Sequence, residues 1–394
     1  MSSITVPIID TDTHLSEPPD LWTSRLSGGK WRDEELPRLV LDTRRNEERW
    51  VVAGRMLTGV ANWTFAGWPE YPPSHPTTMA EADPGGWDAV HRIKRMDEQG
   101  IAAEVIYPNL LGFSSHAFLA IEDAELRLQC IRAYNDYLID FASPDPSRFI
   151  LLTSLPFWDV AASVAEIERC HDLGHRGVLF ASKPFKVGMP ALADEHWRPI
   201  FSTAQERGLS INFHVGFQDI TQDEQRAMIG ARSARSDYAK LSTLSMLGLA
   251  EGMCEVLLSG VCHNFPTLKF VAVESGFGWI PFLLEAADWQ WRNSGAASAY
   301  PEREMPSTYF RRQCFGTFWY ERNTVRSMIA DFADNIMFES DYPHPTSLSP
   351  GPASSSKTVR ETVNDTLSTV PSDVVRKILY DNAAALYGLP ALGH

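Results

Sequence analysis

The sequence predicts an α/β protein built as a (β/α)8 TIM barrel. Three observations lead to this fold class. Eight short apolar runs recur along the 394 residues, the segments between them carry apolar residues at helical spacing, and the first run ends in Asp and His rather than in a glycine-rich turn. Strands that alternate with helices indicate parallel βα units, and eight such units close into a barrel. The competing open, doubly wound sheet would need a glycine-rich phosphate turn after its first strand.

The expected strands are short and mostly apolar. They lie at residues 6–14, 102–109, 148–157, 176–184, 209–216, 268–276, 312–321 and 335–344. Between them, segments such as 123–142 and 159–174 place apolar residues at the spacing of a helix. Asp159 stands where a helix N-cap is expected, and Gly174 follows the expected C-terminal end. Periodicity and capping residues therefore agree on the same alternation.

Segment 16–86, directly after the first strand, differs from the rest of the chain. It is rich in Pro and Trp and contains the alternating piece RWVVAG at residues 49–54. We interpret it as a long excursion with a small hairpin, inserted into a single domain of residues 1–394. Long ordered loops tend to be lids or binding elements, although its aromatic residues can also serve only to pack it onto the barrel. The candidates for a substrate pocket are Trp63, Phe65, Trp68 and, at the end of the fourth strand, Lys183.

Composition argues against some classes of partner. The net charge is −15 and the pI is about 5.2, whereas nucleic acids and anionic membranes attract basic surfaces. No apolar run approaches the roughly 18 residues of a membrane span, and the N-terminus does not resemble a signal peptide. The five cysteines are scattered without a CxxC pair. We therefore expect a cytoplasmic protein with reduced thiols that acts on a small molecule, and a homodimer as its default assembly.

Polar side chains stand at the ends of several expected strands. The first strand ends in Asp10, Asp12 and His14, which are spaced two apart and so share one face. The other strand ends carry Lys183, His214, Glu274, Asp341 and His344. In a closed barrel these ends meet at one mouth, where imidazoles and carboxylates would stay unsatisfied without a divalent cation. Mixed ligation of this kind suits Zn²⁺, Mn²⁺ or Fe²⁺. Asp10, one step deeper, is expected to support the other two by hydrogen bonding.

Four stretches carry a resemblance to a known family. They are DTDTH at 10–14, NFHVG at 212–216, ESDYPH at 339–344 and ILYDNAAALYGL at 378–389. In this order on eight strands, the sequence resembles the amidohydrolase superfamily. The most similar branch includes aminocarboxymuconate-semialdehyde decarboxylase and the resorcylate-type decarboxylases. The resemblance spans nearly the whole chain apart from the excursion, and it implies a metal-dependent enzyme.

The resemblance also implies which residues hold the metal. One divalent transition metal is expected, Zn²⁺ first, with Mn²⁺ and Fe²⁺ as alternatives. The implied ligands are Asp12, His14, His214 and Asp341, with Asp12 standing where the family usually has the first His of an HxH pair. The sixth strand departs from the family, because the usual HGG reads Glu-Ser-Gly here. Glu274 is therefore interpreted either as a further ligand or as a base beside the metal.

Two reactions fit this set of residues. In hydrolysis, a metal-activated water attacks a small, partly apolar or aromatic substrate, Asp341 moves the proton, and Glu274 orients the water or the metal. His344 either assists the leaving group or only caps a turn. In the alternative, protonated Asp341 delivers a proton to the ring carbon of a hydroxylated aromatic acid as CO₂ leaves, with Arg55 or Arg92 facing the substrate carboxylate. Three carboxylates make the site anionic, which favours hydrolysis. A non-catalytic barrel that binds a small molecule is the third interpretation.

Overall fold

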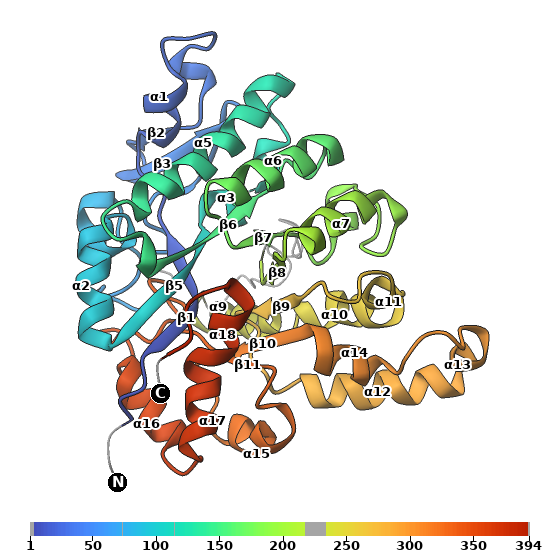
Figure 1. The fold of residues 1–394 in the computed structure, drawn as a ribbon. Coiled ribbons are helices and arrows are strands. Elements are labelled where there is room, and N and C mark those ends of the chain that lie inside the picture. The colour runs from blue at the N-terminus through green and yellow to red at the C-terminus, as the bar shows by residue number, and fades with distance from the viewer. Residues whose placement is uncertain (1–3, 73, 114, 217–233, 393–394) are drawn as a thin grey trace.

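Eight parallel strands form a nearly closed barrel in the computed structural model, which describes residues 4–72, 74–113, 115–216 and 234–392 (Figure 1). The strands are β1 (Ile8–Leu15), β5 (Ile101–Pro108), β6 (Phe149–Ser154), β7 (Gly177–Leu179), β8 (Ser210–His214), β9 (Phe270–Val273), β10 (Cys314–Phe318) and β11 (Ile336–Phe338). They are hydrogen-bonded in this order, which is also their order along the chain. The predicted (β/α)8 barrel is confirmed.

Backbone contacts between the first and last strands bring the barrel together. The N–H of His14 donates to the carbonyl of Tyr342 at 2.6 Å, and the N–H of Asp341 donates to the carbonyl of Asp12 at 3.0 Å. Thr13 and Tyr342 form a parallel bridge. These contacts lie at the C-terminal ends of β1 and β11, so the seam of the barrel runs directly beneath the polar strand ends.

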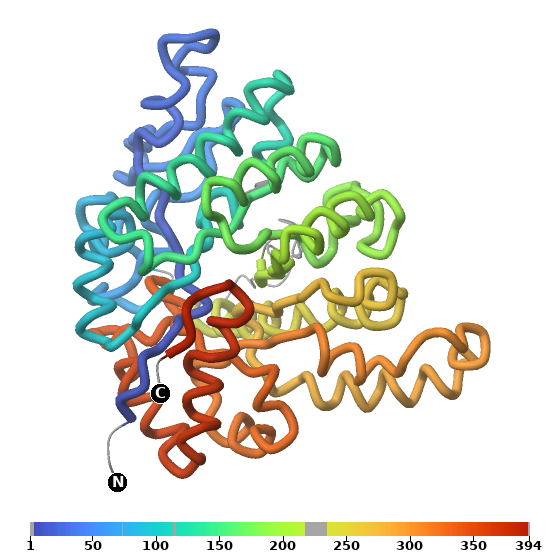
Figure 2. The backbone as a smooth tube through the Cα atoms, viewed as in Figure 1, coloured from blue at the N-terminus to red at the C-terminus, as the bar shows by residue number. Residues whose placement is uncertain are grey.

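Helices cover the outside of the barrel, as the smooth trace of the backbone also shows (Figure 2). They are α1 (Leu21–Leu26), α2 (Ala89–Gln99), α3 (Leu110–Phe113), α4 (Ser115–Phe118), α5 (Ala124–Ala142), α6 (Val160–Asp172), α7 (Arg198–Glu206), α9 (Ala234–Met246), α10 (Leu249–Leu258), α11 (Val261–Asn264), α12 (Ile280–Asn293), α13 (Ala296–Ala299), α14 (Pro306–Gln313), α15 (Asn323–Phe332), α16 (Val359–Leu367), α17 (Ser372–Arg376) and α18 (Asn382–Tyr387). The side chain of Asp159 accepts a hydrogen bond from the N–H of Ala162, so the predicted N-cap of α6 is confirmed.

Alternation along the strands separates the inside of the barrel from its outside. Ile9 and Val105 belong to a buried cluster inside the barrel, whereas their neighbours Ile8 and Ile106 belong to the larger cluster between strands and helices. Because side chains in a strand point alternately to opposite faces, each strand buries both of its faces. The C-terminal helix α18 packs into the inner cluster.

The excursion after β1 forms a small sheet of its own. Its strands are β2 (Arg38–Asp42), β3 (Glu47–Val52) and β4 (Arg55–Gly59), paired antiparallel in that order. The predicted hairpin is therefore part of a three-stranded sheet. Trp22 anchors the excursion, because its indole N–H donates to the carbonyl of Cys130 in α5 at 2.9 Å and its ring meets that of Trp50 edge-on. Part of the aromatic content thus serves to pack the excursion onto the barrel.

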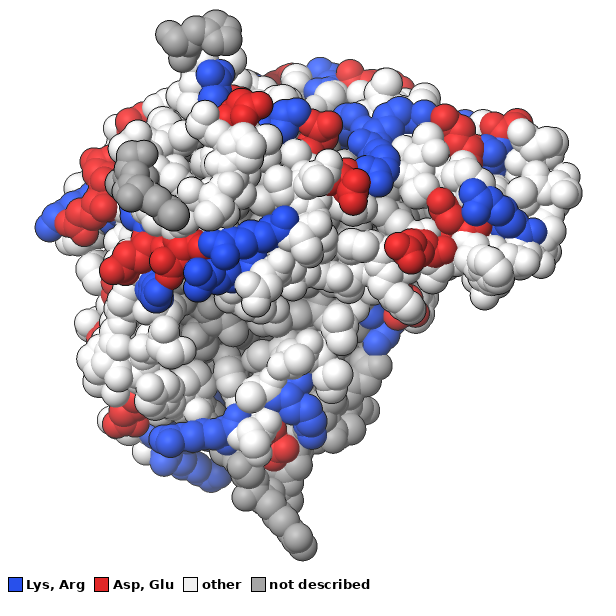
Figure 3. Space-filling view, turned by 90° about the horizontal axis from the view of Figure 1, so that it is seen from below, with Lys and Arg blue, Asp and Glu red and all other residues white. Residues whose placement is uncertain are grey.

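The surface and one apolar helical stretch bear on possible partners. Acidic and basic side chains are interspersed on the face shown in Figure 3. Within the described residues, Arg235–Leu258, which includes most of α9 and all of α10, is a helical stretch of 24 residues that is long and apolar enough to cross a membrane. By length and composition alone, this stretch contradicts the expectation that no apolar run approaches the length of a membrane span. One such helix is weak evidence for insertion, because the core helices of soluble proteins pass the same test.

Candidate active site and metal centre

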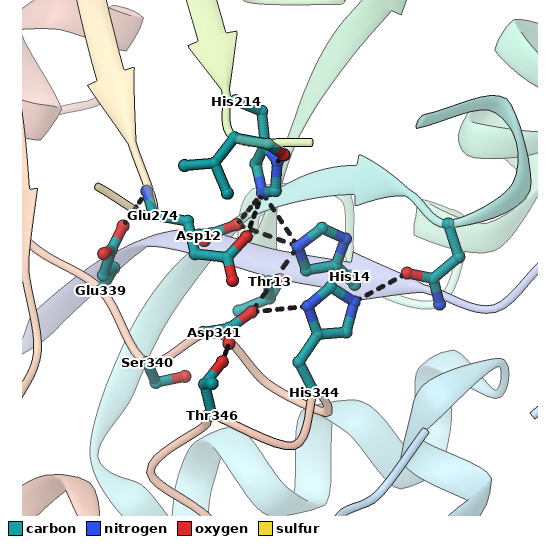
Figure 4. Close-up of polar contacts among 12 residues, drawn as sticks. Asp12, Thr13, His14, His214, Glu274, Glu339, Ser340, Asp341, His344 and Thr346 are labelled. Carbon is teal, nitrogen blue, oxygen red and sulfur yellow. Dashed lines mark hydrogen bonds and ion pairs between the residues drawn. The ribbon is translucent and has the colours of Figure 1, made fainter. Parts of the chain in front are cut away.

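The polar strand ends converge at the mouth of the barrel (Figure 4). Asp12 and His14 come from β1, and His214 is the last residue of β8. Glu274 follows β9 directly, and Asp341 follows β11 by three residues. All five side chains are buried. Strands far apart in sequence thus deliver two imidazoles and three carboxylates to one small volume, as the barrel topology requires.

The donor atoms lie at distances that suit a shared ion. The Nε2 atoms of His14 and His214 are 3.0 Å apart, and each lies 3.4 Å from Oδ1 of Asp12. His14 Nε2 is 3.7 Å from Asp341 Oδ1, and His214 Nε2 is 3.4 Å from Glu274 Oε2. Ligand atoms that each lie about 2.1 Å from one metal are separated by roughly 3.0–3.4 Å in octahedral or tetrahedral geometry. The spacing therefore fits a cation shared by Asp12, His14, His214 and Glu274, whereas Asp341 belongs to a second group with His14, Glu274 and His344.

Asp12 supplies the sharpest test of this fit. Neither of its carboxylate oxygens receives a hydrogen bond from any residue that the structure describes, although the side chain is completely buried. Burial, and then the charges of Asp341 and Asp10, raise the pKa of Asp12 well above its usual range. A buried carboxylate without donors is costly unless a cation faces it. The side chain of Asp12 is thus arranged for a metal ion rather than for a hydrogen bond.

The imidazole of His14 is in the form that metals bind. Burial lowers the pKa of His14 well below its usual range, with further lowering from His344 and His214. The ring is therefore neutral near pH 7, as metal ligation requires. A divalent metal consequently fits the residues present, in agreement with the sequence prediction, whereas the residues do not distinguish Zn²⁺ from Mn²⁺ or Fe²⁺.

Asp341 and His344 form a chain of contacts that ends on Asn109. His344 Nδ1 lies 2.8 Å from Asp341 Oδ1, and His344 Nε2 lies 2.9 Å from Asn109 Oδ1. The amide N–H₂ of Asn109 donates to Ser16 Oγ at 3.2 Å, which directs the amide oxygen toward His344. Nε2 of His344 is therefore a donor. The hydroxyl of Thr346 donates to the other oxygen of Asp341. His344 is thus held in the site and is more than a turn cap.

Two of the acidic residues have a left-handed backbone. Glu274 has φ of 55° and Asp341 has φ of 58°, conformations that non-glycine residues adopt at a cost of about 1–3 kcal/mol. Glu339 Oε2 accepts a hydrogen bond from the N–H of Glu274 at 3.1 Å, while Asp12 accepts the N–H of Asp341 through its carbonyl. The surrounding structure therefore holds both carboxylates in these conformations and aims them into the mouth.

Sequence reasoning missed several residues that build the site. Glu339 is wholly buried, and burial raises its pKa well above the usual range. It stands two residues before Asp341, so strand periodicity offered a signal for it. Asn109 ends the second predicted strand and carried the same kind of signal. Tyr238, on α9, lines the cavity beside the site, and no pattern in the sequence pointed to it.

Asp10 lies one step below the site, as predicted. Its Oδ1 accepts hydrogen bonds from the N–H of Ser340 at 2.8 Å and of Asp12 at 3.4 Å. Burial, and then the charge of Glu104, raise the pKa of Asp10 to about 7. Asp10 thus ties β1 to the loop that carries Asp341.

A cavity of about 150 Å³ opens beside the metal ligands. Trp63 of the excursion, Tyr238, Glu274 and His344 are among its lining residues. Of the other predicted pocket residues, Phe65 and Trp68 line a separate crevice of about 20 Å³ on the far side of Pro345. Lys183 does not line the cavity, and its ammonium pairs with Glu251 at 3.2 Å.

The expected arginines do not face this cavity. Arg92 is completely buried, with its guanidinium 3.0 Å from Glu104 and donating to the carbonyl of His14 at 2.5 Å. The expectation that Arg92 reaches a substrate carboxylate is therefore wrong, because its donors are consumed in joining α2 to β1 and β5. Arg55 is exposed on β4 and is not among the residues that line the cavity.

Fold and site together define a metal-dependent enzyme of the amidohydrolase type. The sequence model of the amidohydrolase family matches residues 9–389, and the chain belongs to this family. The resemblance predicted from the four strand-end and C-terminal stretches is confirmed.

Similar relatives with assigned activities include decarboxylases and a hydratase. The hydratase, which acts on 2-keto-4-carboxy-3-hexenedioate in Sphingobium sp. (strain NBRC 103272 / SYK-6), is 23% identical over 262 residues, 64% of this chain and 68% of that protein. A gamma-resorcylate decarboxylase from Polaromonas sp. (strain JS666) is 24% identical over 266 residues, 64% of this chain and 76% of that protein. A 2-amino-3-carboxymuconate-6-semialdehyde decarboxylase from Dictyostelium discoideum is 25% identical over 278 residues, 67% of this chain and 69% of that protein. The crystal structure of a dihydroxybenzoic acid decarboxylase from Polaromonas sp. JS666, with bound manganese and the inhibitor 2-nitroresorcinol, matches with a TM-score of 0.62 at 19% identity over 97% of each chain. These similarities favour the decarboxylase alternative over the hydrolase that the charge of the site had favoured.

Proposed function

We propose that this protein is a metal-dependent, non-oxidative decarboxylase of a hydroxylated aromatic or related carboxylic acid. The relatives with this activity support the proposal, and so does the arrangement of proton-carrying groups in the cavity. Hydrolysis needs a water beside the metal and a base, which the same residues can also supply, so the two reactions must be separated by experiment.

The proposal names the residues that would act as metal ligands. Asp12, His14 and His214 would bind it together with Glu274, which the structure groups with them. Asp341 would be a further donor from the adjoining group that it forms with His14, Glu274 and His344. When bound, the metal draws electron density from the substrate carboxylate and a neighbouring hydroxyl. We propose Mn²⁺ or Zn²⁺ as the resident ion, with Fe²⁺ as the remaining alternative.

The observation that carries the proposal is the Asp341–His344–Asn109 chain. Because Asn109 accepts the Nε2 proton of His344, the 2.8 Å contact between His344 Nδ1 and Asp341 Oδ1 needs one further proton. The proposal places that proton on this pair of buried groups, of which His344 lines the cavity. Decarboxylation requires such a proton, because the carbon that loses CO₂ must gain one.

The reaction balances with these groups alone. The bond between the ring carbon and the carboxylate breaks, its electron pair stays on the ring carbon, and CO₂ departs. The Asp341–His344 pair then gives its proton to that carbon, and solvent restores the proton. Trp63 and Tyr238 line the cavity and exclude part of the surrounding water, which suits an aromatic substrate.

A single assay separates decarboxylation from hydrolysis. The protein, loaded separately with Mn²⁺ and Zn²⁺, is incubated with hydroxybenzoic acids and with a matched set of their esters and amides. We expect CO₂ and the corresponding phenol from at least one acid, and no product from Asp341→Asn. Cleavage of the esters or amides without CO₂ release would replace the proposal by hydrolysis. Metal binding with no product from either set would favour the non-catalytic binding barrel.

The proposal extends to assembly and location. We propose a homodimer, because the helices around barrels of this kind commonly pair between subunits. Sedimentation velocity of the metal-loaded protein tests it, and a single monomer peak at micromolar concentration would contradict it. We also propose a cytoplasmic protein that binds neither nucleic acid nor membrane. Recovery in the membrane fraction after cell lysis would contradict that proposal and point to Arg235–Leu258.

A further inference from the structure

A second, larger cavity adjoins the catalytic one. It has a volume of about 570 Å³, within the range of roughly 300–1,000 Å³ that is typical of small-molecule sites. Met246, Pro345 and Thr346 line both cavities. We call this larger space the outer pocket. Because the hydroxyl of Thr346 contacts Asp341, the wall between the two spaces belongs to the catalytic site itself.

Contacts among its walls show that the outer pocket is a built feature of the fold. The indole N–H of Trp319 donates to the carbonyl of Thr346 at 3.1 Å, which joins the end of β10 to the loop after β11. The hydroxyl of Tyr320 lies 3.3 Å from the sulfur of Met246, which joins the same strand end to α9. The excursion adds Tyr71 to the lining. Four separate segments therefore enclose this pocket.

The outer pocket and the catalytic cavity differ in charge. Within the described part of the chain, the charged side chains that line the outer pocket are Arg322, Lys357 and Asp365, which together carry one net positive charge. Lys357 is paired with Asp365. Arg322 is exposed. The hydrogen bond and charge of Lys357, and then the charge of Arg322, lower the pKa of Asp365. Among the residues that the structure describes, the lining of the catalytic cavity includes Glu274 and neither Lys nor Arg.

Hydroxyl groups add to the polar lining of the outer pocket. Ser354 and Ser356 are hydrogen-bonded to each other at 2.8 Å and line it together with Ser355. Hydroxyls and a guanidinium are the groups that bind carboxylates in proteins, the guanidinium in a bidentate manner. Trp319 and Tyr320 add aromatic rings to the lining. Such a pocket suits an apolar arm that ends in an anion.

We propose that the outer pocket is a substrate subsite for a second anionic group, and that Arg322 determines this specificity. The inference rests on the proposed function, because it places the reacting carboxylate in the catalytic cavity and the distal anion at Arg322. It also provides the attraction for an anionic substrate that the acidic metal site lacks. The substrate class is then an aromatic acid with a side arm that ends in a carboxylate or a similar anion, rather than a simple hydroxybenzoate.

Two matched pairs of probes test the proposal. The first pair is 4-aminophenol acylated with a butanoyl or a succinyl arm, which differ only in the terminal methyl or carboxylate. Their binding to the metal-loaded protein is measured by calorimetry and does not depend on turnover. The second pair is 5-aminosalicylate with the same two arms, whose decarboxylation is followed as CO₂ release. Arg322→Gln removes the proposed contact, and Arg44→Gln, at the exposed turn after β2, is the control.

We expect the succinyl phenol to bind roughly five- to tenfold more tightly than the butanoyl phenol in the unmodified protein and in Arg44→Gln. In Arg322→Gln the two affinities should agree within about twofold. Equal affinities in the unmodified protein, or a preference that survives in Arg322→Gln, would overturn the subsite. If both salicylates are decarboxylated with no preference for the arm, the subsite is wrong and the decarboxylase stands. If the arm preference appears without any CO₂, the subsite stands and the decarboxylase is wrong.

Discussion

Replacing Glu17 by Gln tests a buried carboxyl that supports the site. Glu17 follows β1, and its oxygens accept hydrogen bonds from the N–H of Leu110 at 2.8 and 2.9 Å and of Leu111 at 3.2 Å. Leu110 is the neighbour of Asn109, whose amide holds His344. Burial outweighs these hydrogen bonds and raises the pKa of Glu17 from 4.5 to about 7.

The pKa difference sets both the sign and the size of the effect. The folded protein holds the Glu17 proton more tightly than the unfolded chain, so its contribution to stability is fully present below about pH 4.5. That contribution is lost as the pH rises through 7. At about 1.4 kcal/mol for each pH unit, the loss over this interval is at most about 3 kcal/mol. A glutamine keeps an oxygen acceptor for the same N–H groups but has no proton to lose.

Urea unfolding at pH 5, 6, 7 and 8 measures this effect. We expect the free energy of unfolding of Glu17→Gln, relative to the unmodified protein, to rise by about 2–3 kcal/mol between pH 5 and pH 8. Other buried carboxyls that titrate near pH 7, such as Asp10 and Glu321, are present in both proteins and cancel in the difference. The exposed Glu34→Gln serves as control and should leave the difference flat. A flat difference for Glu17→Gln would refute the reasoning.

Four further substitutions address the site. Asp341→Asn should lower turnover by at least about 10²-fold with an unchanged far-UV circular dichroism spectrum, and full activity would remove Asp341 from the mechanism. Glu274→Gln should lower metal affinity about 10- to 100-fold, as measured by titration with Zn²⁺; full metal content with lost turnover would make Glu274 a base instead of a ligand. Asn109→Ala should lower kcat about 10- to 100-fold at unchanged metal content, because His344 loses its orienting acceptor; an unchanged kcat would show that this contact is dispensable. His214→Ala should purify with much less than one equivalent of metal, and retention of the full equivalent would exclude His214 as a ligand.

Local patterns in the sequence determined the fold and most of the metal site. Apolar runs alternate with helical segments over eight repeats, and this alternation has few solutions other than a parallel barrel. Once the barrel is inferred, the ends of its strands must meet. Asp12, His14, His214 and Asp341 could therefore be brought together from strand ends up to 329 residues apart without any knowledge of their distances.

Other features depended on which groups meet across the fold. From the sequence, Arg92 is a plausible partner for a substrate carboxylate. Only the tertiary structure shows that its guanidinium is already paired with Glu104 and hydrogen-bonded to the carbonyl of His14. The sequence favoured hydrolysis because three carboxylates at the barrel mouth make the site anionic. That argument did not include Arg322, which lines the adjoining pocket. That pocket is assembled from the excursion, α9 and two strand ends. No local pattern specifies such an enclosure, because it arises from side-chain packing between segments that are remote in sequence.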